Sequence, residues 1–191
     1  KVSLFSGLNN LYDMTLDPSY STICGYTDHD IDAVFAAELE DLDRQQIKEW
    51  YNGYNWLGAG VYNPFDILQL FKTRVFKNYW FETGTPTFLI NLLKQHDVYK
   101  IERKKVGFAS IDSYELDNIN LTTLLFQTGY LTIKEETEEL VTLDYPNKEV
   151  ESSMYQHLIG AYIHSDVDTA IPLVLQMQEA FLQNDQATII D

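Results

Sequence analysis

The chain is 191 residues long and holds 29 Asp and Glu against 13 Lys and Arg, a formal net charge of −16. This length suits one domain or two small ones. The negative charge repels phosphate backbones, so a nucleic-acid role would need a local basic patch. We find no run of about 18 apolar residues that could span a bilayer and no targeting segment at the start. The single cysteine, Cys24, cannot form an internal disulfide, which indicates a reducing, cytoplasmic setting.

The first expected elements are a short strand and two helices. Residues 1–5 alternate like a strand and are followed by a loop-rich stretch. Thr27 and Asp30 fit the capping pattern of a helix start. The apolar residues that then share one helical face are Ile31, Val34, Phe35 and Leu39. A second helix is predicted from about residue 42 to 51, with an inward face made of Ile47, Trp50 and Tyr51.

An unusually aromatic stretch follows this second helix, at residues 49–56 (EWYNGYNW) and 60–65 (GVYNPF). Gly53 and Asn55 tolerate a positive φ, and Asn63 before Pro64 is typical of a helix start. The pattern favours a packed aromatic turn between two helices. The alternative is a surface that meets a nucleotide or another domain.

Two further helices are predicted in the middle of the chain. Residues 64–72 are so apolar that we expect the central helix there, and Thr85 and Pro86 start another helix that runs to residue 95. Residues 96–118 are mixed and polar, which predicts a long connection with one short strand at about 105–110.

The last part predicts helix, hairpin and helix. A short helix near residues 121–125 stops at Gly129, and residues 130–134 and 140–144 alternate as two strands. Pro146 and Asn147 then start a helix whose apolar face holds Val150, Met154, Leu158, Ala161 and Tyr162. A final amphipathic helix is predicted at about 169–182. The order is typical of a winged-helix-like unit, in a mainly α (α+β) fold.

Motifs for catalysis are missing from the sequence. It contains no Gly-rich phosphate loop of the P-loop type, no dinucleotide fingerprint, no Cys-x-x-Cys and no His-Glu-x-x-His. Glu102 and Lys104 match half of a metal-dependent nuclease motif, with Asp97 upstream. That chemistry needs two carboxylates and a lysine on adjacent strands, whereas Asp97 is separated from Glu102 by a short polar stretch. We therefore predict no catalytic and no metal-binding residue.

The charges also argue against DNA binding by the winged-helix-like unit. Its predicted hairpin tip, residues 135–139, reads EETEE, and these carboxylates would repel phosphate. The basic residues Lys100, Arg103, Lys104 and Lys105 gather in the preceding connection. A solvated loop is the favoured interpretation of this cluster, and a contiguous basic face is what the nucleic-acid alternative requires.

Several blocks together resemble a known family. They are residues 1–11 (KVSLFSGLNNL), 23–27 (ICGYT), 50–54 (WYNGY), 61–64 (VYNP), 84–89 (GTPTFL) and 127–132 (QTGYLT). In this order they are similar to the signature blocks of bacterial AAA-ATPase-like proteins that carry a PD-(D/E)XK nuclease-like domain at their C-terminus. The resemblance covers nearly the whole chain.

The resemblance implies a middle segment of a longer protein. Residues 1–95 would be the end of the P-loop domain and its helical, lid-type bundle. Residues 96–165 would be the winged-helix-like unit with one β-hairpin, and 166–191 a helix leading to the nuclease-like domain. The partners would be the P-loop and nuclease-like domains of the same protein, with no membrane involved. ATP and Mg²⁺ would be bound by the parent protein, without a cofactor bound by this segment alone.

The resemblance also suggests where a nucleotide would come close. In related ATPases a Gly-x-Pro turn of the lid approaches the adenine, and Gly84, Thr85 and Pro86 resemble that turn. A capped helix start is the alternative interpretation of the turn. Tyr54 in the aromatic stretch is the second candidate. We therefore expect a non-catalytic regulatory and interaction segment that couples the two missing domains, with a nucleic-acid-binding winged-helix module as the alternative.

Overall fold

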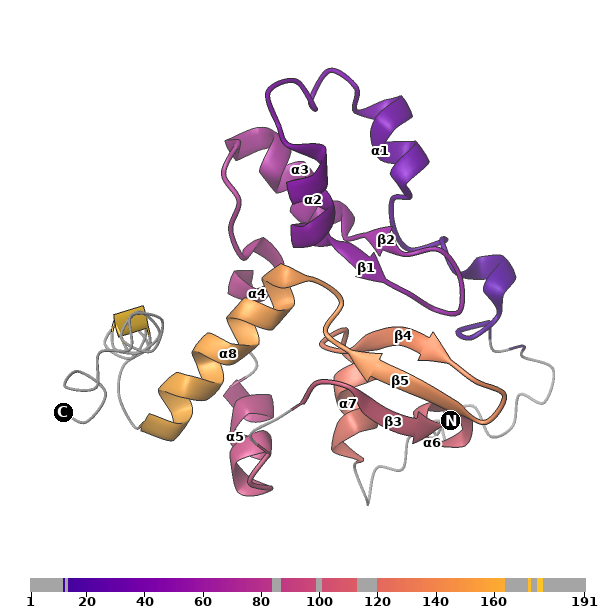
Figure 1. Ribbon diagram of the computed structural model, residues 1–191, viewed down its shortest axis with the longest axis vertical. Helices are drawn as coiled ribbons and strands as arrows, with labels where there is room; N and C mark the ends of the chain where they lie inside the picture. Colours follow the sequence, from indigo (N-terminus) through magenta and orange to yellow (C-terminus); the bar gives the residue numbers. More distant parts are fainter. Residues whose placement is uncertain are drawn as a thin grey trace. The chain divides into compact units, whose positions relative to one another are not determined.

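The computed structural model describes residues 12, 14–83, 87–98, 101–112, 120–163, 172, 175 and 176. They form two compact units, one from the described part of 1–85 and 100–151 and the other from that of 86–99 and 152–191. Helices and small antiparallel sheets together confirm the predicted α+β class (Figure 1). The strand predicted at 1–5 and most of the helix predicted at 169–182 lie outside the described residues.

The first unit begins with a short 3-10 helix (η2, Pro18–Tyr20) and helix α1 (Asp28–Val34). The predicted capping box of α1 is confirmed, because Thr27 N donates to Asp30 Oδ2 (2.8 Å) and Asp30 N to Thr27 Oγ1 (3.2 Å). The helix ends at Val34, which is 67% exposed. The prediction that Val34 faces the core is therefore wrong, since the chain turns before the face can continue. Phe35 and Leu39 still pack against the core from the turn that follows.

Helix α2 (Arg44–Tyr51) leads directly into a small hairpin, β1 (Asn52–Tyr54) and β2 (Val61–Tyr62), which pair antiparallel. The aromatic stretch is thus a hairpin between two helices. Gly53 has the expected positive φ of 124°, whereas the other positive φ in this turn falls at Leu57 (61°) instead of Asn55. The N–H of Asn55 donates to Thr132 Oγ1 (2.7 Å).

Helix α3 (Pro64–Thr73) starts as predicted, with Asn63 Oδ1 accepting from Phe65 N (3.0 Å) and Pro64 in the first turn. Phe65 and Leu68 are 40% and 49% exposed, so α3 buries only one of its apolar faces and is not a wholly central helix. Helix α4 (Tyr79–Thr83) follows and was not predicted. The core of this region consists of Ile31, Ile47, Tyr51, Tyr62, Ile67, Leu70 and Tyr79.

The rest of the first unit is a three-stranded antiparallel sheet in the order β3–β5–β4, with β3 at Lys104–Gly107, β4 at Thr132–Glu136 and β5 at Leu140–Asp144 (Figure 1). The short strand expected near residues 105–110 is β3, and it extends the predicted hairpin. Helices α6 (Phe108–Asp112) and α7 (Leu121–Gln127) lie between β3 and β4 in the chain. Gly129 ends the α7 region with a φ of 84°.

The second unit contains helix α5 (Thr87–Gln95) and the later part of helix α8 (Lys148–Ile163). Lys94 Nζ donates to the carbonyl of Ala161 (2.8 Å), and Tyr162 Oη to that of Val98 (3.1 Å). Leu89 and Leu93 of α5 are buried, while Phe88 is 61% exposed.

The order α7, β4, β5, α8 is the expected helix–hairpin–helix order, and the winged-helix-like assignment of this part stays a prediction. The first unit joins residues from the predicted lid segment with residues from the predicted winged-helix-like segment. The assignments of 1–95, 96–165 and 166–191 to named domains also stay predictions. No described helix has the length and apolar character needed to cross a membrane.

Gly53 shows how tightly β1 is packed within the first unit. A Cβ built on Gly53 would lie 2.0 Å from the carbonyl oxygen of Pro146, in the segment before α8. Its φ of 124° is in addition a conformation that residues with a Cβ rarely adopt. Only glycine therefore allows the hairpin and this segment to approach so closely.

We expect Gly53→Ala to lower the free energy of unfolding by about 3 kcal/mol, because backbone strain and a steric clash add up. Gly107→Ala is the matched control: the nearest heavy atom to its added Cβ is 4.0 Å away, and no positive φ is involved. This control should change stability by about 0.5 kcal/mol or less. Urea unfolding of both variants measures the difference, and equal stabilities would contradict the close approach.

Candidate ligand site at the aromatic corner

A cavity of about 210 Å³ lies at the aromatic corner of the first unit. Its walls come from the loop before α1, the β1–β2 hairpin, the start of α3 and helix α4. The lining residues are Cys24, Tyr54, Trp56, Val61, Tyr62, Asn63, Pro64 and Trp80. Tyr54, predicted from the sequence as a candidate site residue, is thus part of the wall.

Three aromatic rings, those of Tyr54, Trp56 and Trp80, form part of the cavity wall. The rings of Tyr54 and Trp56 are nearly parallel, at 13° with their centroids 6.3 Å apart. The ring of Trp80 stands at 81° to that of Tyr54, with a centroid distance of 6.5 Å. Tyr54 itself is only 8% exposed, whereas Trp56 and Trp80 are half-buried. A ligand in the cavity would therefore meet mainly the two indole rings.

The two segments that carry these rings are held by hydrogen bonds from elsewhere in the first unit. Asn55, between Tyr54 and Trp56, exchanges two hydrogen bonds with Thr132 of β4: its N–H donates to the hydroxyl (2.7 Å), which donates to its carbonyl (3.0 Å). Glu149 Oε1 accepts from the backbone N–H of Trp80 (2.8 Å). The rings are therefore placed by fixed backbone on both sides.

Two buried carboxyl groups lie next to the cavity wall. Asp66 of α3 and Glu149 of α8 are both 0% exposed. Besides Trp80, Glu149 Oε1 accepts from the N–H of Phe81 (3.4 Å), and so caps the start of α4. Burial and, after it, the negative charge of Glu149 raise the pKa of Asp66 to about 9. At neutral pH the pair therefore keeps a proton on Asp66 and carries one negative charge.

The hydroxyl of Tyr54 lies in the field of this acid pair. Burial, followed by the charges of Asp66 and Glu149, raises the pKa of Tyr54 well above its ordinary value. Tyr54 therefore stays neutral. At neutral pH, where Asp66 keeps its proton, the negative charge beside this wall is that of Glu149 alone. An uncharged or cationic group suits such a wall, and a phosphate does not.

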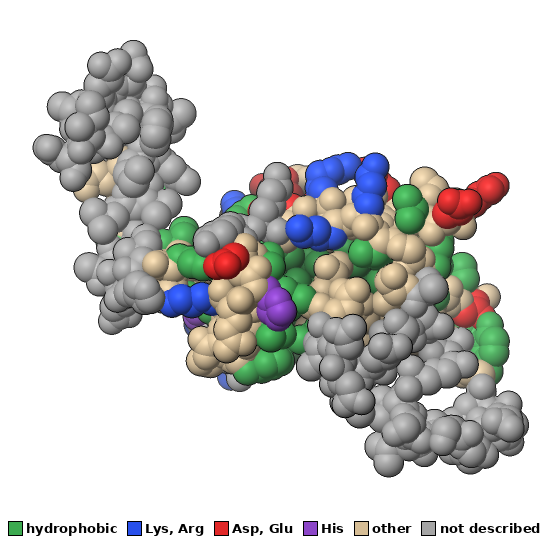
Figure 2. Space-filling model, turned by 90° about the horizontal axis from the view of Figure 1, so that it is seen from below, with side chains coloured by type: hydrophobic (Ala, Val, Ile, Leu, Met, Phe, Trp, Pro, Cys, Tyr) green, Lys and Arg blue, Asp and Glu red, His purple; other side chains and the backbone are tan. Residues whose placement is uncertain are grey.

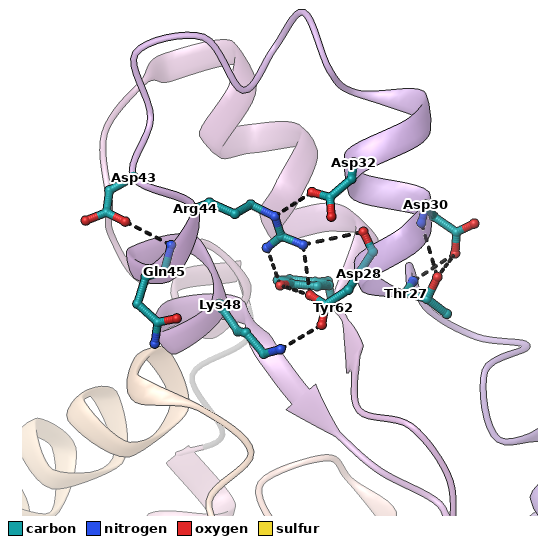
Figure 3. A network of polar contacts seen from close by, with 9 residues as sticks. All are labelled: Thr27, Asp28, Asp30, Asp32, Asp43, Arg44, Gln45, Lys48 and Tyr62. Carbon is teal, nitrogen blue, oxygen red and sulfur yellow. Dashed lines mark hydrogen bonds and ion pairs between the residues drawn. The ribbon is translucent and has the colours of Figure 1, made fainter.

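A polar network holds Tyr62, another lining residue of the cavity (Figure 3). Asp28 accepts from Arg44 Nη2 (2.8 Å), Lys48 Nζ (2.6 Å) and Tyr62 Oη (2.6 Å), and Asp32 accepts from Arg44 Nε (2.8 Å). Burial acts to raise the pKa of Asp28, but the hydrogen bonds from Lys48, Tyr62 and Arg44 prevail and lower it to about 2. The guanidinium of Arg44 also lies over the Tyr62 ring, 5.2 Å from its centroid.

This network ties α1 to α2 and to β2, so its charges serve the fold. Two carboxylates, Asp28 and Asp32, face two cations, Arg44 and Lys48, and the network is neutral as a whole. It therefore adds no net charge to the neighbouring cavity.

The other predicted nucleotide-facing residues, Gly84, Thr85 and Pro86, lie outside the described residues, and their role stays a prediction. Asp97 lies in the turn after α5, in the second unit, with a φ of 51°. Glu102 and Lys104 belong to the first unit, where Lys104 pairs with Leu143 in the sheet. Within the described part of the chain, no group of three or more His, Cys, Asp or Glu side chains is placed to hold a metal ion.

The predicted basic cluster is small and partly engaged. Arg103 Nη2 donates to Glu135 Oε1 (2.9 Å), so one of its cations pairs with the acidic hairpin. Lys100 lies outside the described residues. Figure 2 shows a small group of Lys and Arg side chains on the face drawn, with other basic side chains apart from it. Arg103 therefore has less charge to offer a phosphate than the sequence suggests.

Sequence reasoning missed three residues of this site: Trp80, Asp66 and Glu149. Tyr79, Trp80 and Phe81 are consecutive aromatic residues, which was a signal for a buried short helix. Asp66 is the only acidic residue in the apolar helix α3. Glu149 looks like an ordinary first-turn carboxylate, and nothing local distinguishes it from exposed ones.

We expect the stability of the chain to fall as pH rises from about 4, the ordinary pKa of Asp, to about 9, because the folded state holds the Asp66 proton and the unfolded state releases it. The slope from this group approaches about 1.4 kcal/mol per pH unit at most. Asp66→Asn imitates the neutral acid and should flatten this dependence, so that its stability relative to the wild type is higher at about pH 8 than at about pH 5.

Urea unfolding at the two pH values measures this effect. Glu138→Gln, which changes an exposed carboxylate of the hairpin tip, is the control and should keep the wild-type pH dependence. A wild-type slope retained in Asp66→Asn would show that Asp66 is ionised in the folded state.

Comparison with known proteins gives one similar sequence. A protein of Azotobacter chroococcum mcd 1, described as an uncharacterized protein in the vnfD 5′ region, is 46% identical over 191 residues. The match covers 97% of this chain and 37% of that protein, so the chain spans well under half of the length of this curated relative. No family model and no solved structure matches the chain.

Proposed function

We propose that the chain is a non-catalytic regulatory and interaction segment of a longer AAA-ATPase-like protein. In this role it couples a P-loop ATPase domain to a PD-(D/E)XK nuclease-like domain, and the parent protein binds ATP and Mg²⁺. The observation that carries the proposal is the aromatic cavity beside Tyr54, a concave surface built from four separate segments of the chain. Such a concave, mainly aromatic surface is suited to binding.

The charged side chains make structural contacts, which supports a role in binding instead of catalysis. Asp28, Arg44 and Lys48 hold helices together, and Glu149 caps α4. Each of these side chains is engaged with the protein itself, so it is committed to structure. Asp66 keeps its proton next to Glu149, which also makes it a poor base at neutral pH.

The size and charge of the cavity limit which ligands it can bind. About 210 Å³ is below the roughly 300–1,000 Å³ of pockets that enclose drug-sized ligands. The cavity therefore suits one ring or one side chain, and its negative wall excludes phosphates. In our proposal the P-loop domain holds the phosphates, and the turn of Gly84, Thr85 and Pro86 lies nearest to the nucleotide. Tyr54 is the candidate nucleotide-facing residue at the aromatic corner.

A nucleic-acid-binding winged-helix module is the second candidate. The order α7, β4, β5, α8 favours it. The pairing of Arg103 with Glu135 and the acidic tip of the hairpin count against it, because both reduce the attraction for phosphates. A winged-helix module of this kind should bind duplex DNA more weakly as salt rises and lose affinity in Lys105→Glu, which gel-shift titrations would detect.

We expect Pro86→Ala to weaken ATP binding by the full-length protein about tenfold, a loss of about 1.4 kcal/mol, with the melting temperature unchanged. Trp56→Ala tests whether the nucleotide also reaches the aromatic corner. Phe88→Ala, which removes an exposed ring of α5, is the control. Calorimetry with ATP and Mg²⁺ measures all three. Wild-type affinity in both Pro86→Ala and Trp56→Ala would contradict a nucleotide-facing role for this segment.

A further inference from the structure

The aromatic cavity has a feature that a nucleotide does not require, a negative wall. Tyr54 and Trp80 belong to the lining, and both are linked to the buried acids: the Tyr54 hydroxyl lies in their field, and Glu149 accepts from the Trp80 N–H (2.8 Å). Asp66 lies in the first turn of α3, whose first residue, Pro64, lines the cavity. The acids are not lining residues themselves, but Glu149 binds the backbone of one lining residue and Asp66 shares helix α3 with another.

Aromatic rings in front of a negative charge are a recognised environment for cations. The face of an indole or phenol ring attracts Lys, Arg and other cations, and more strongly when water is excluded. This region of the chain already uses that contact. Arg44 lies over Tyr62 (5.2 Å to the centroid), Lys77 over Tyr79 (5.2 Å) and Lys148 over Trp50 (5.3 Å).

Two cations of the first unit, Arg44 and Lys134, are engaged by neighbouring groups. Arg44 is balanced by Asp28 and Asp32. Lys134 donates to the carbonyl of Pro146 (2.8 Å), and burial lowers its pKa, with Asp144 and Glu151 acting in the opposite direction. The chain as a whole has a net charge of −16, which attracts cationic partners over longer distances.

We propose that this cavity binds an arginine side chain of an adjoining protein domain, with the guanidinium against the rings of Trp56 and Trp80. Arginine fits better than lysine because its planar group stacks on aromatic faces and is more weakly hydrated. The cavity volume of about 210 Å³ accommodates a side chain. This inference deepens the proposed function: it rests on the coupling role for the source of the side chain, and it leaves the nucleotide to the turn of residues 84–86.

The test compares a charged ligand with its neutral counterpart. N-acetyl-arginine amide and N-acetyl-citrulline amide have nearly the same shape and differ in charge. The chain has three tryptophans, and Trp50 serves as an internal control because it packs against Tyr51 and Phe76, away from the cavity lining. The indole signals of the full-length protein are followed by NMR and assigned with Trp→Phe variants.

We expect the arginine compound to shift the Trp56 and Trp80 signals in a saturable way, about tenfold more tightly than the citrulline compound, and to leave Trp50 unchanged. Trp56→Leu should abolish the response of Trp80. Phe88→Leu, on an exposed site of α5, should retain it. Equal affinity for the two compounds, the absence of saturable shifts, or an unchanged response in Trp56→Leu would each overturn the proposal.

The ATP measurement gives an independent result. If ATP alone shifts Trp56 and Trp80, the cavity takes the base, and the arginine proposal is overturned while the proposed function stands. If the arginine compound binds as expected and Pro86→Ala has no effect on ATP affinity, the cation site stands and the nucleotide-facing role of the turn is lost.

Discussion

The carboxylate of Glu149 is the contact on which much of the first unit depends. A single oxygen accepts the N–H groups of Trp80 and Phe81, which would otherwise be unsatisfied at the start of α4. The side chain that does this is wholly buried and lies beside a second acid, Asp66. Burying one charge is tolerable when donors compensate it, and burying two is not. The proton on Asp66 follows from this constraint.

The parts of the fold that the sequence predicted are those set by local chemistry. Thr27 with Asp30, Asn63 with Pro64, and Gly129 each mark an element boundary through their own backbone preferences, and the structure has boundaries at these places. The parts that were missed depend on distant partners. Helix α4 is too short to be stable from its own sequence and is fixed by Glu149, which lies 69 residues after Trp80.

The candidate site likewise contains residues that the sequence predicted and residues that it did not. Tyr54 was found because a dense aromatic stretch is visible in the sequence. In the structure, residues of this stretch line the cavity. Trp80 and the acid pair come from other segments, and only the tertiary structure brings them beside Tyr54. The half-nuclease pattern at Glu102 and Lys104 is a match of spacing alone. The structure places Lys104 in β3, opposite Leu143, and the absence of a catalytic role there stays a prediction.

The proton of Asp66 has a meaning beyond its effect on charge. It is bound in the folded state and released in the unfolded state over a wide range of pH, so it behaves as a stoichiometric ligand of the native protein. Because the carboxyl group is inaccessible to water, exchange of this proton requires a transient opening around α3 and the start of α8. The rate at which this proton exchanges with solvent therefore reports how often the structure around α3 and the start of α8 opens locally.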